Sequence, residues 1–129
     1  TMRGIGVCPV GEYCTWDVSE SAIAYMSALN KHFKLYQKEI DERHAWNYAA
    51  APQWPRLEDQ VLGIVGFGKI GKCTAEKARG LVKKIIACDP HVPHGDFVAR
   101  GVDRVEKDEL LAQSDIIVNH MCLTDDNER

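Results

Sequence analysis

Residues 61–72 read Val61-Leu-Gly-Ile-Val-Gly66-Phe-Gly68-Lys-Ile-Gly71-Lys72. A short apolar run leads into three glycines in the spacing G-x-G-x-x-G, and a helix-compatible segment follows. In this pattern a strand, a tight turn and a helix N-terminus together hold the pyrophosphate of a dinucleotide. The glycine spacing alone is weak evidence, so the rest of the chain has to supply the context.

The three glycines have different expected roles. Gly66 permits the tight turn out of the strand, Gly68 lets the backbone approach the pyrophosphate, and Gly71 allows close packing of helix on strand. Free amide groups at the helix start, at the positive end of the helix dipole, then face the phosphate oxygens. Lys69 either adds a phosphate contact or is simply solvated. The candidate cofactor-binding residues in this segment are Gly66, Phe67, Gly68, Lys69, Ile70 and Gly71.

Asp89 follows Gly71 by 18 residues, at the end of the next apolar run. A carboxylate about 20 residues after the motif accepts hydrogen bonds from the adenosine ribose hydroxyls. A 2'-phosphate would bring further negative charge beside this carboxylate, and Pro90, not an arginine, comes next. NAD is therefore favoured over NADP. The alternative is that Asp89 only forms a turn before Pro90.

Composition narrows the class of protein. The 129 residues suit one domain, with 45% hydrophobic and 27% charged residues and a formal net charge of -3. This charge indicates neither a nucleic-acid partner nor an anionic membrane, and no apolar run is long enough to span a bilayer. Five scattered cysteines indicate reduced thiols in a cytoplasmic protein and no metal site.

The sequence before the glycine motif predicts a long helix. Residues 4–8 are compatible with a short strand, and Asp17 with Glu20 suggests a capping box at a helix start. Apolar residues then recur with steps of four and three, which places them on one stripe of a helix over Asp17–Arg43. The stripe serves either packing on its own domain or a second copy of the chain. It comprises Ala22, Met26, Leu29, Phe33, Tyr36 and Ile40.

The sequence after the motif alternates between strands and helices. A helix through about residue 79 or 81 should follow the glycines, with Ala75, Ala78 and Leu81 inward. Strands are expected at 61–65, 85–88, 101–105 and 115–120, a loop at 91–95, and a helix at 107–113. This alternation predicts an α/β fold: a Rossmann-type doubly wound parallel sheet in three αβα layers, partial, and preceded by the long helix. In the strand order 3-2-1-4, His120 and Thr124 would lie at the ligand-binding switch point.

These segments, taken in order, resemble D-isomer-specific 2-hydroxyacid dehydrogenases, nearest to the phosphoglycerate dehydrogenase-like and C-terminal-binding-protein-like branches. The resemblance covers nearly the whole chain and is more specific than the glycine motif alone. It rests on residues 4–8, 13–15, 18–20, 62–71, 87–90, 108–115 and 120–124.

The resemblance implies an NAD-dependent oxidoreductase that transfers hydride between nicotinamide and a 2-hydroxy/2-oxo acid. Residues 1–16 would then be an opening strand and hinge from a substrate domain, and 17–129 an incomplete NAD-binding domain. Thr15 would lie near the nicotinamide, and His120, Cys122 and Thr124 along the riboses. The helix Asp17–Arg43 would form a homodimer.

Some features depart from the family pattern. Pro9 stands where Asn is common, Asp59 where a turn glycine is usual, and Cys122 where Pro is frequent. The family's catalytic Arg, Glu and His are expected downstream of the segment matching Leu123–Arg129, so the chain alone should not catalyse hydride transfer. A non-catalytic NAD(H)-sensing or dimerisation module of a corepressor-like relative is the alternative.

Overall fold

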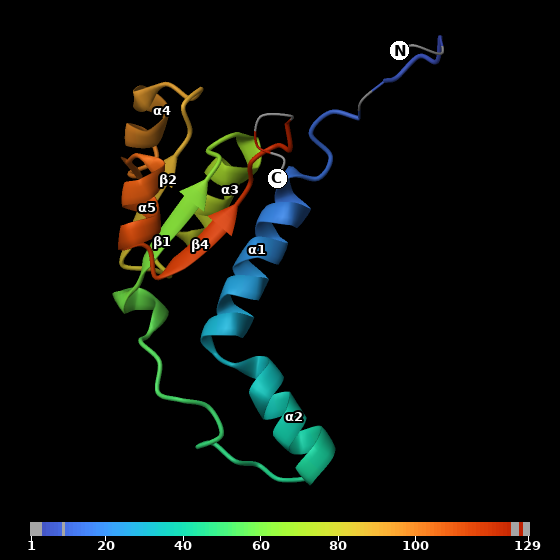
Figure 1. Ribbon diagram of the computed structural model, residues 1–129, viewed down its shortest axis with the longest axis vertical. Helices are drawn as coiled ribbons and strands as arrows, with labels where there is room; N and C mark the ends of the chain where they lie inside the picture. The colour runs from blue at the N-terminus through green and yellow to red at the C-terminus, as the bar shows by residue number, and fades with distance from the viewer. Residues whose placement is uncertain (1–3, 9, 125–126, 128–129) are drawn as a thin grey trace.

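The computed structural model describes residues 4–8, 10–124 and 127. Its centre is a four-stranded, all-parallel sheet in the order β3-β2-β1-β4 (Figure 1). The strands are β1 (Val61–Val65), β2 (Lys84–Cys88), β3 (Asp103–Arg104) and β4 (Ile116–Asn119). The predicted Rossmann-type fold and strand order are therefore confirmed.

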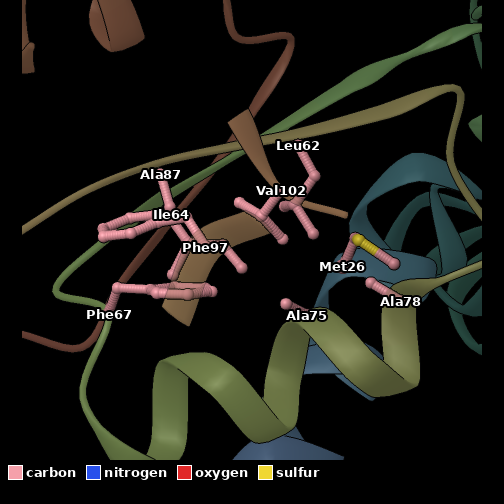
Figure 2. Packing of buried hydrophobic residues seen from close by; sticks show 9 residues of the cluster. All are labelled: Met26, Leu62, Ile64, Phe67, Ala75, Ala78, Ala87, Phe97 and Val102. Atoms are coloured by element: carbon pink, nitrogen blue, oxygen red, sulfur yellow. The ribbon is translucent and has the colours of Figure 1, made fainter. Parts of the chain in front are cut away.

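The two faces of the sheet carry separate apolar clusters, which gives three layers. Alternate residues of β1 point to opposite faces because side chains alternate along a strand. Leu62 and Ile64 pack toward α3 (Lys69–Ala78) and α4 (His94–Val98), together with Met26 of α1 (Figure 2). Val65 and Ile86 pack on the other face against Leu110 of α5 (Lys107–Gln113).

The long helix predicted over Asp17–Arg43 is two helices, α1 (Thr15–Asn30) and α2 (Phe33–Arg43). His32 separates them in the left-handed region, with φ of +53°. The break is held by tertiary contacts: the Asn30 side chain donates to the Pro55 carbonyl at 3.3 Å, and the His32 ring packs edge-on against Trp54. Apolar spacing cannot reveal such contacts, because they come from a segment 22 or more residues away.

The apolar stripe becomes exposed toward the end of α1, before this break. Met26 is buried, and α1 packs beside α3, whereas Leu29 and Phe33 are 75% and 60% exposed. Within residues 31–59, all of which the structure describes, none is fully buried. Figure 1 shows α2 projecting beyond the sheet, at the end of the molecule away from α4. We call residues 29–56 the helical arm.

Several local predictions were wrong. Residues 4–8 form no strand and are exposed, while α1 begins at Thr15 with no side-chain cap from any described residue, so Asp17 merely lies in its first turn. The segment expected as a loop at 91–95 contains the start of α4. Leu81 is exposed because α3 ends at Ala78.

The remaining boundaries shift by small amounts. α3 begins at Lys69, two residues before Gly71, and the four strands lie within one to two residues of their predicted ends. The fourth strand was expected to be buried. In β4, however, half-buried residues alternate with exposed ones, because β4 is the last strand of the sheet. The segment 44–60 is irregular as expected, apart from the 3-10 helix η1 (Leu57–Asp59). Pro9, which departs from the family pattern in sequence, lies outside the described residues.

None of the helices in the described part of the chain is both long enough and apolar enough to cross a membrane.

Candidate dinucleotide-binding site

The carboxyl ends of three strands meet at Gly66. The Gly66 amide donates to the Cys88 carbonyl at 2.9 Å, and the His120 amide donates to the Val65 carbonyl at 2.7 Å. Gly66 has φ of +88°, and a Cβ there would lie 2.8 Å from the carbonyl carbon of His120. A side chain is thus excluded both by conformation and by space. Ligands bind at this edge of open parallel sheets, where the strand order reverses between β1 and β4.

The other two glycines differ sharply in their surroundings. A Cβ on Gly71 would lie 2.2 Å from the Gly66 carbonyl oxygen, so α3 packs directly on the turn. A Cβ on Gly68 would meet no described atom within 4 Å. Gly68 is the exposed N-cap of α3, and no side chain of a described residue caps this helix start. The first amides of α3 are therefore left for an anionic ligand, in front of open space.

Phe67, between these glycines, points away from the open side. Its side chain is fully buried and stacks on Phe97 of α4, with ring centroids 4.5 Å apart and an interplanar angle of 17° (Figure 2). The guanidinium of Arg104 lies 5.6 Å from the centroid of the Phe97 ring. Phe67 thus anchors the glycine loop (residues 66–71) in the core and offers no side-chain surface to a cofactor.

Asp89 binds two backbone amides after β2. Its Oδ2 accepts from the Phe67 amide at 2.8 Å, and its Oδ1 accepts from the His91 amide at 2.9 Å. The bond to the His91 amide forms a turn around Pro90, the alternative role of Asp89. The bond to the Phe67 amide joins Asp89 to the glycine loop. Asp89 is half-buried and Pro90 is exposed, so both lie beside the loop at the sheet's carboxyl edge.

His120 faces α3 at the end of β4. Its Nε2 lies 2.9 Å from Oγ1 of Thr74, a fully buried residue of α3. Burial lowers the pKa of His120, because desolvation disfavours the imidazolium. The His120 ring is thus engaged within the protein, while its backbone contacts the Gly66 turn.

The remaining predicted site residues lie on two segments. Thr15 is half-buried at the start of α1, which runs beside α3: Ser19 Oγ lies 3.2 Å from Cys73 Sγ. Lys69 is exposed and pairs with Glu12 instead of standing free, while Ile70 is half-buried.

Cys122 and Thr124 are exposed in the segment after β4. Asn127 bonds to the backbone of both: its Nδ2 donates to the Cys122 carbonyl and its Oδ1 accepts from the Thr124 amide, both at 2.8 Å. The structure therefore gathers the glycine loop, Asp89 and His120 at one edge. Thr15 is the first residue of α1, which packs beside α3.

The sequence prediction missed α4 and its side chains. Asp96 pairs with Lys72 of α3, and this hydrogen bond lowers the pKa of the Asp96 carboxyl. Arg100, which follows α4, donates to Glu76 at 3.1 Å. The acid in the first turn of α4, Asp96, was a signal of a helix start. The helix was not predicted because α4 is short and contains a glycine.

Two further chemical features concern cysteine and metal ligands. Burial raises the pKa of the Cys88 thiol at the end of β2, so this thiol is neutral near pH 7. No three His, Cys, Asp or Glu residues of the described chain cluster as a metal site would require.

Comparison with known proteins identifies this architecture. The sequence model of the D-isomer specific 2-hydroxyacid dehydrogenase NAD binding domain matches residues 23–129. The chain belongs to this family. The family's cofactor, NAD, agrees with the acidic residue after β2 and with the uncapped start of α3.

Individual relatives agree with this assignment. The chain is 34% identical to a hydroxypyruvate reductase of Thermotoga maritima over 123 residues, covering 95% of this chain and 39% of that protein. Among solved structures, the pyruvate reductase of Chlamydomonas reinhardtii superposes with a TM-score of 0.79 and 32% identity, over 97% of this chain and 36% of that one.

A more distant structure supports the fold alone. The NAD-complexed 2-hydroxyacid dehydrogenase of Lactobacillus delbrueckii has a TM-score of 0.81 at 20% identity, over 92% of this chain and 36% of that one. The chain spans about two fifths of the length of some curated relatives and 11% to 22% of the length of others.

Proposed function

We propose that this chain is the NAD(H)-binding part of an oxidoreductase that transfers hydride between nicotinamide and a 2-hydroxy/2-oxo acid. One observation carries the proposal: the uncapped start of α3 faces open space at Gly68, and a carboxylate stands at the end of the neighbouring strand. A pyrophosphate needs the first feature and an adenosine ribose the second. When bound, NAD would supply the hydride acceptor.

The residues of this chain would bind and orient the cofactor. Amides of Gly68, Lys69 and Ile70 would face the pyrophosphate, and Asp89 would accept from the ribose hydroxyls. By resemblance, the backbone of 120–124 would follow the riboses, and Thr15 would lie near the nicotinamide. For these residues we propose binding of NAD(H). We also propose that the protein acts in the cytoplasm.

The helical arm supports a homodimer in this proposal. None of the α2 residues is buried, although the helix carries Phe33, Leu35 and Ile40 with exposures of 41% to 60%. An amphipathic helix that leaves its apolar side chains in water is better stabilised by packing on another surface. The resemblance implies that this surface belongs to a second copy of the chain. It also implies that the substrate of the protein is a small-molecule 2-hydroxy or 2-oxo acid.

Titration with NADH, followed calorimetrically, tests the cofactor proposal. The folded chain should bind NADH, and Gly68→Ala should weaken binding at least about tenfold, because its Cβ would occupy the space in front of α3. Stability should hardly change, since that Cβ meets no described atom within 4 Å. Absence of NADH binding by the folded parent chain would refute the proposal.

A further inference from the structure

We propose that Asp89 is a positioning residue for the glycine loop, beyond any contact it makes with ribose. The inference deepens the proposed function and rests on it for the ligand. It concerns what the carboxylate does before a cofactor arrives. The observation behind it is the bond of 2.8 Å from the Phe67 amide to Asp89 Oδ2, which joins residues 22 apart in sequence.

The Phe67 amide depends on this carboxylate. Phe67 is fully buried, and it follows Gly66, whose left-handed conformation turns the chain out of the strand ladder. A buried amide without an acceptor destabilises the conformation that buries it. Asp89 supplies the acceptor at this turn, and the charge of a carboxylate makes such a bond stronger than one to a neutral oxygen.

Two contacts therefore fix Phe67 from different directions. Asp89 holds its amide, and Phe97 of α4 holds its ring by stacking. Asp89 itself is held in place by the His91 amide at 2.9 Å. Since Gly68 follows directly and caps α3, fixing Phe67 also fixes the direction in which the first amides of α3 face the open space.

The carboxylate retains capacity for a ligand in this arrangement. An ionised carboxylate has about four lone-pair sites, and the amides of Phe67 and His91 occupy two of them. The remaining two match the two hydroxyls of an adenosine ribose. Asp89 can thus set the loop and accept the ribose together, without exchanging one partner for the other.

Hydrogen exchange in the cofactor-free protein tests the positioning role directly. Asp89→Asn should speed exchange of the Phe67 amide about tenfold or more, because an amide side chain has a single acceptor oxygen for two donors. Asp115→Asn is the matched control: Asp115 Oδ2 accepts the Val61 amide at 2.8 Å, at the opposite end of β1. It should expose Val61 and leave Phe67 protected. Unchanged Phe67 exchange in Asp89→Asn would overturn the inference.

The unmodified protein provides a second measurement should Asp89→Asn fail to fold. Its Phe67 amide should show a scalar coupling through the hydrogen bond to the side-chain carboxyl carbon of Asp89. It should also exchange at least about tenfold more slowly than an unprotected amide. A missing coupling together with unprotected exchange would refute the positioning role.

A cofactor analogue separates this role from the ribose contact. We would titrate the parent chain and Asp89→Asn with NADH and with an analogue that lacks both adenosine ribose hydroxyls. If Asp89 also positions the loop, the variant should bind the analogue about tenfold more weakly than the parent does. Equal affinities of the parent chain and Asp89→Asn for the analogue would contradict the positioning role and leave Asp89 only its contact with the ribose. Loss of a negative charge would favour an anionic ligand, so charge cannot produce the expected weakening.

The two proposals fail in different ways. A parent chain that binds no NADH but shows Asp89-dependent Phe67 exchange contradicts the proposed function and keeps the positioning role. Normal NADH binding, with Phe67 exchange that does not depend on Asp89, contradicts the positioning role and keeps the proposed function.

Discussion

The sheet region and the helical arm use similar side chains in opposite ways. Phe67 and Phe97 are fully buried in the sheet region, where they stack under the glycine loop. Phe33 and Trp46 lie on the arm and are 60% and 76% exposed. Within one chain, apolar side chains therefore form a closed core around the candidate site and an open surface away from it.

This difference separates two functions physically. A cofactor site needs groups fixed before the ligand arrives, because ordering them on binding reduces affinity. The sheet region supplies that rigidity through packing on both faces. The arm, without a core of its own, gains most from contact with another surface. Three measurements test this contrast.

The largest effect is expected from removing the same ring in the two regions. Phe97→Ala should lower the free energy of unfolding by about 3–5 kcal/mol, because it leaves a cavity under Phe67. Phe33→Ala should lower it by less than about 1 kcal/mol, because the ring is largely in water. Urea unfolding of dilute protein, followed by circular dichroism, gives both values. Similar losses for the two variants would show that the arm is packed as firmly as the sheet.

The sequence could predict the sheet region better than the arm, for a physical reason. Strands β1 and β2, the glycine turn and α5 are specified by local patterns: continuous apolar runs, glycines at fixed spacing and a short periodic segment. The break at His32 depends on contacts with Trp54 and Pro55, which no periodicity encodes. The regular spacing through Ile40 therefore suggested one helix where two are present.

The same distinction holds within the candidate site. Glycine spacing and the position of Asp89 located the sheet edge that the structure assembles. Other contacts of the site join residues that are at least 22 positions apart in sequence. They are the stacking of Phe67 on Phe97, the Thr74–His120 contact and the bond between Phe67 and Asp89. They follow from the folded arrangement of α3 and α4, and local sequence contains only weak signals for them.

An intermediate effect is expected from pH at His120. Its pKa is lower in the folded protein than the usual value of 6.5, so the unfolded chain binds more protons as the pH falls. Stability should therefore decrease as pH falls below about 6.5, and this group should contribute no slope well above that pH. One proton limits the slope to about 1.4 kcal/mol per pH unit, and partial exposure of the ring makes it smaller.

His120→Gln should remove this contribution to the slope. His44→Asn provides the control on the arm, where His44 is exposed and left-handed, a conformation that Asn tolerates. Urea unfolding between pH 5.5 and pH 7.5 gives the comparison. An identical slope in the parent chain and His120→Gln would mean that the Thr74 contact holds the protonated ring equally well.

The smallest effect on the domain itself is expected from charging the arm. Leu29→Lys with Phe33→Lys should change the unfolding free energy of the monomer by less than about 0.5 kcal/mol per site, because both side chains are mostly exposed. If the arm joins two copies, the parent chain should sediment as a dimer and unfold at a midpoint that rises with protein concentration. The double variant should sediment as a monomer with a constant midpoint. Val98→Lys, at a residue of α4 that is 62% exposed, should behave like the parent chain. A parent chain that stays monomeric at high concentration would contradict the dimer and leave the exposed face of α2 without this explanation.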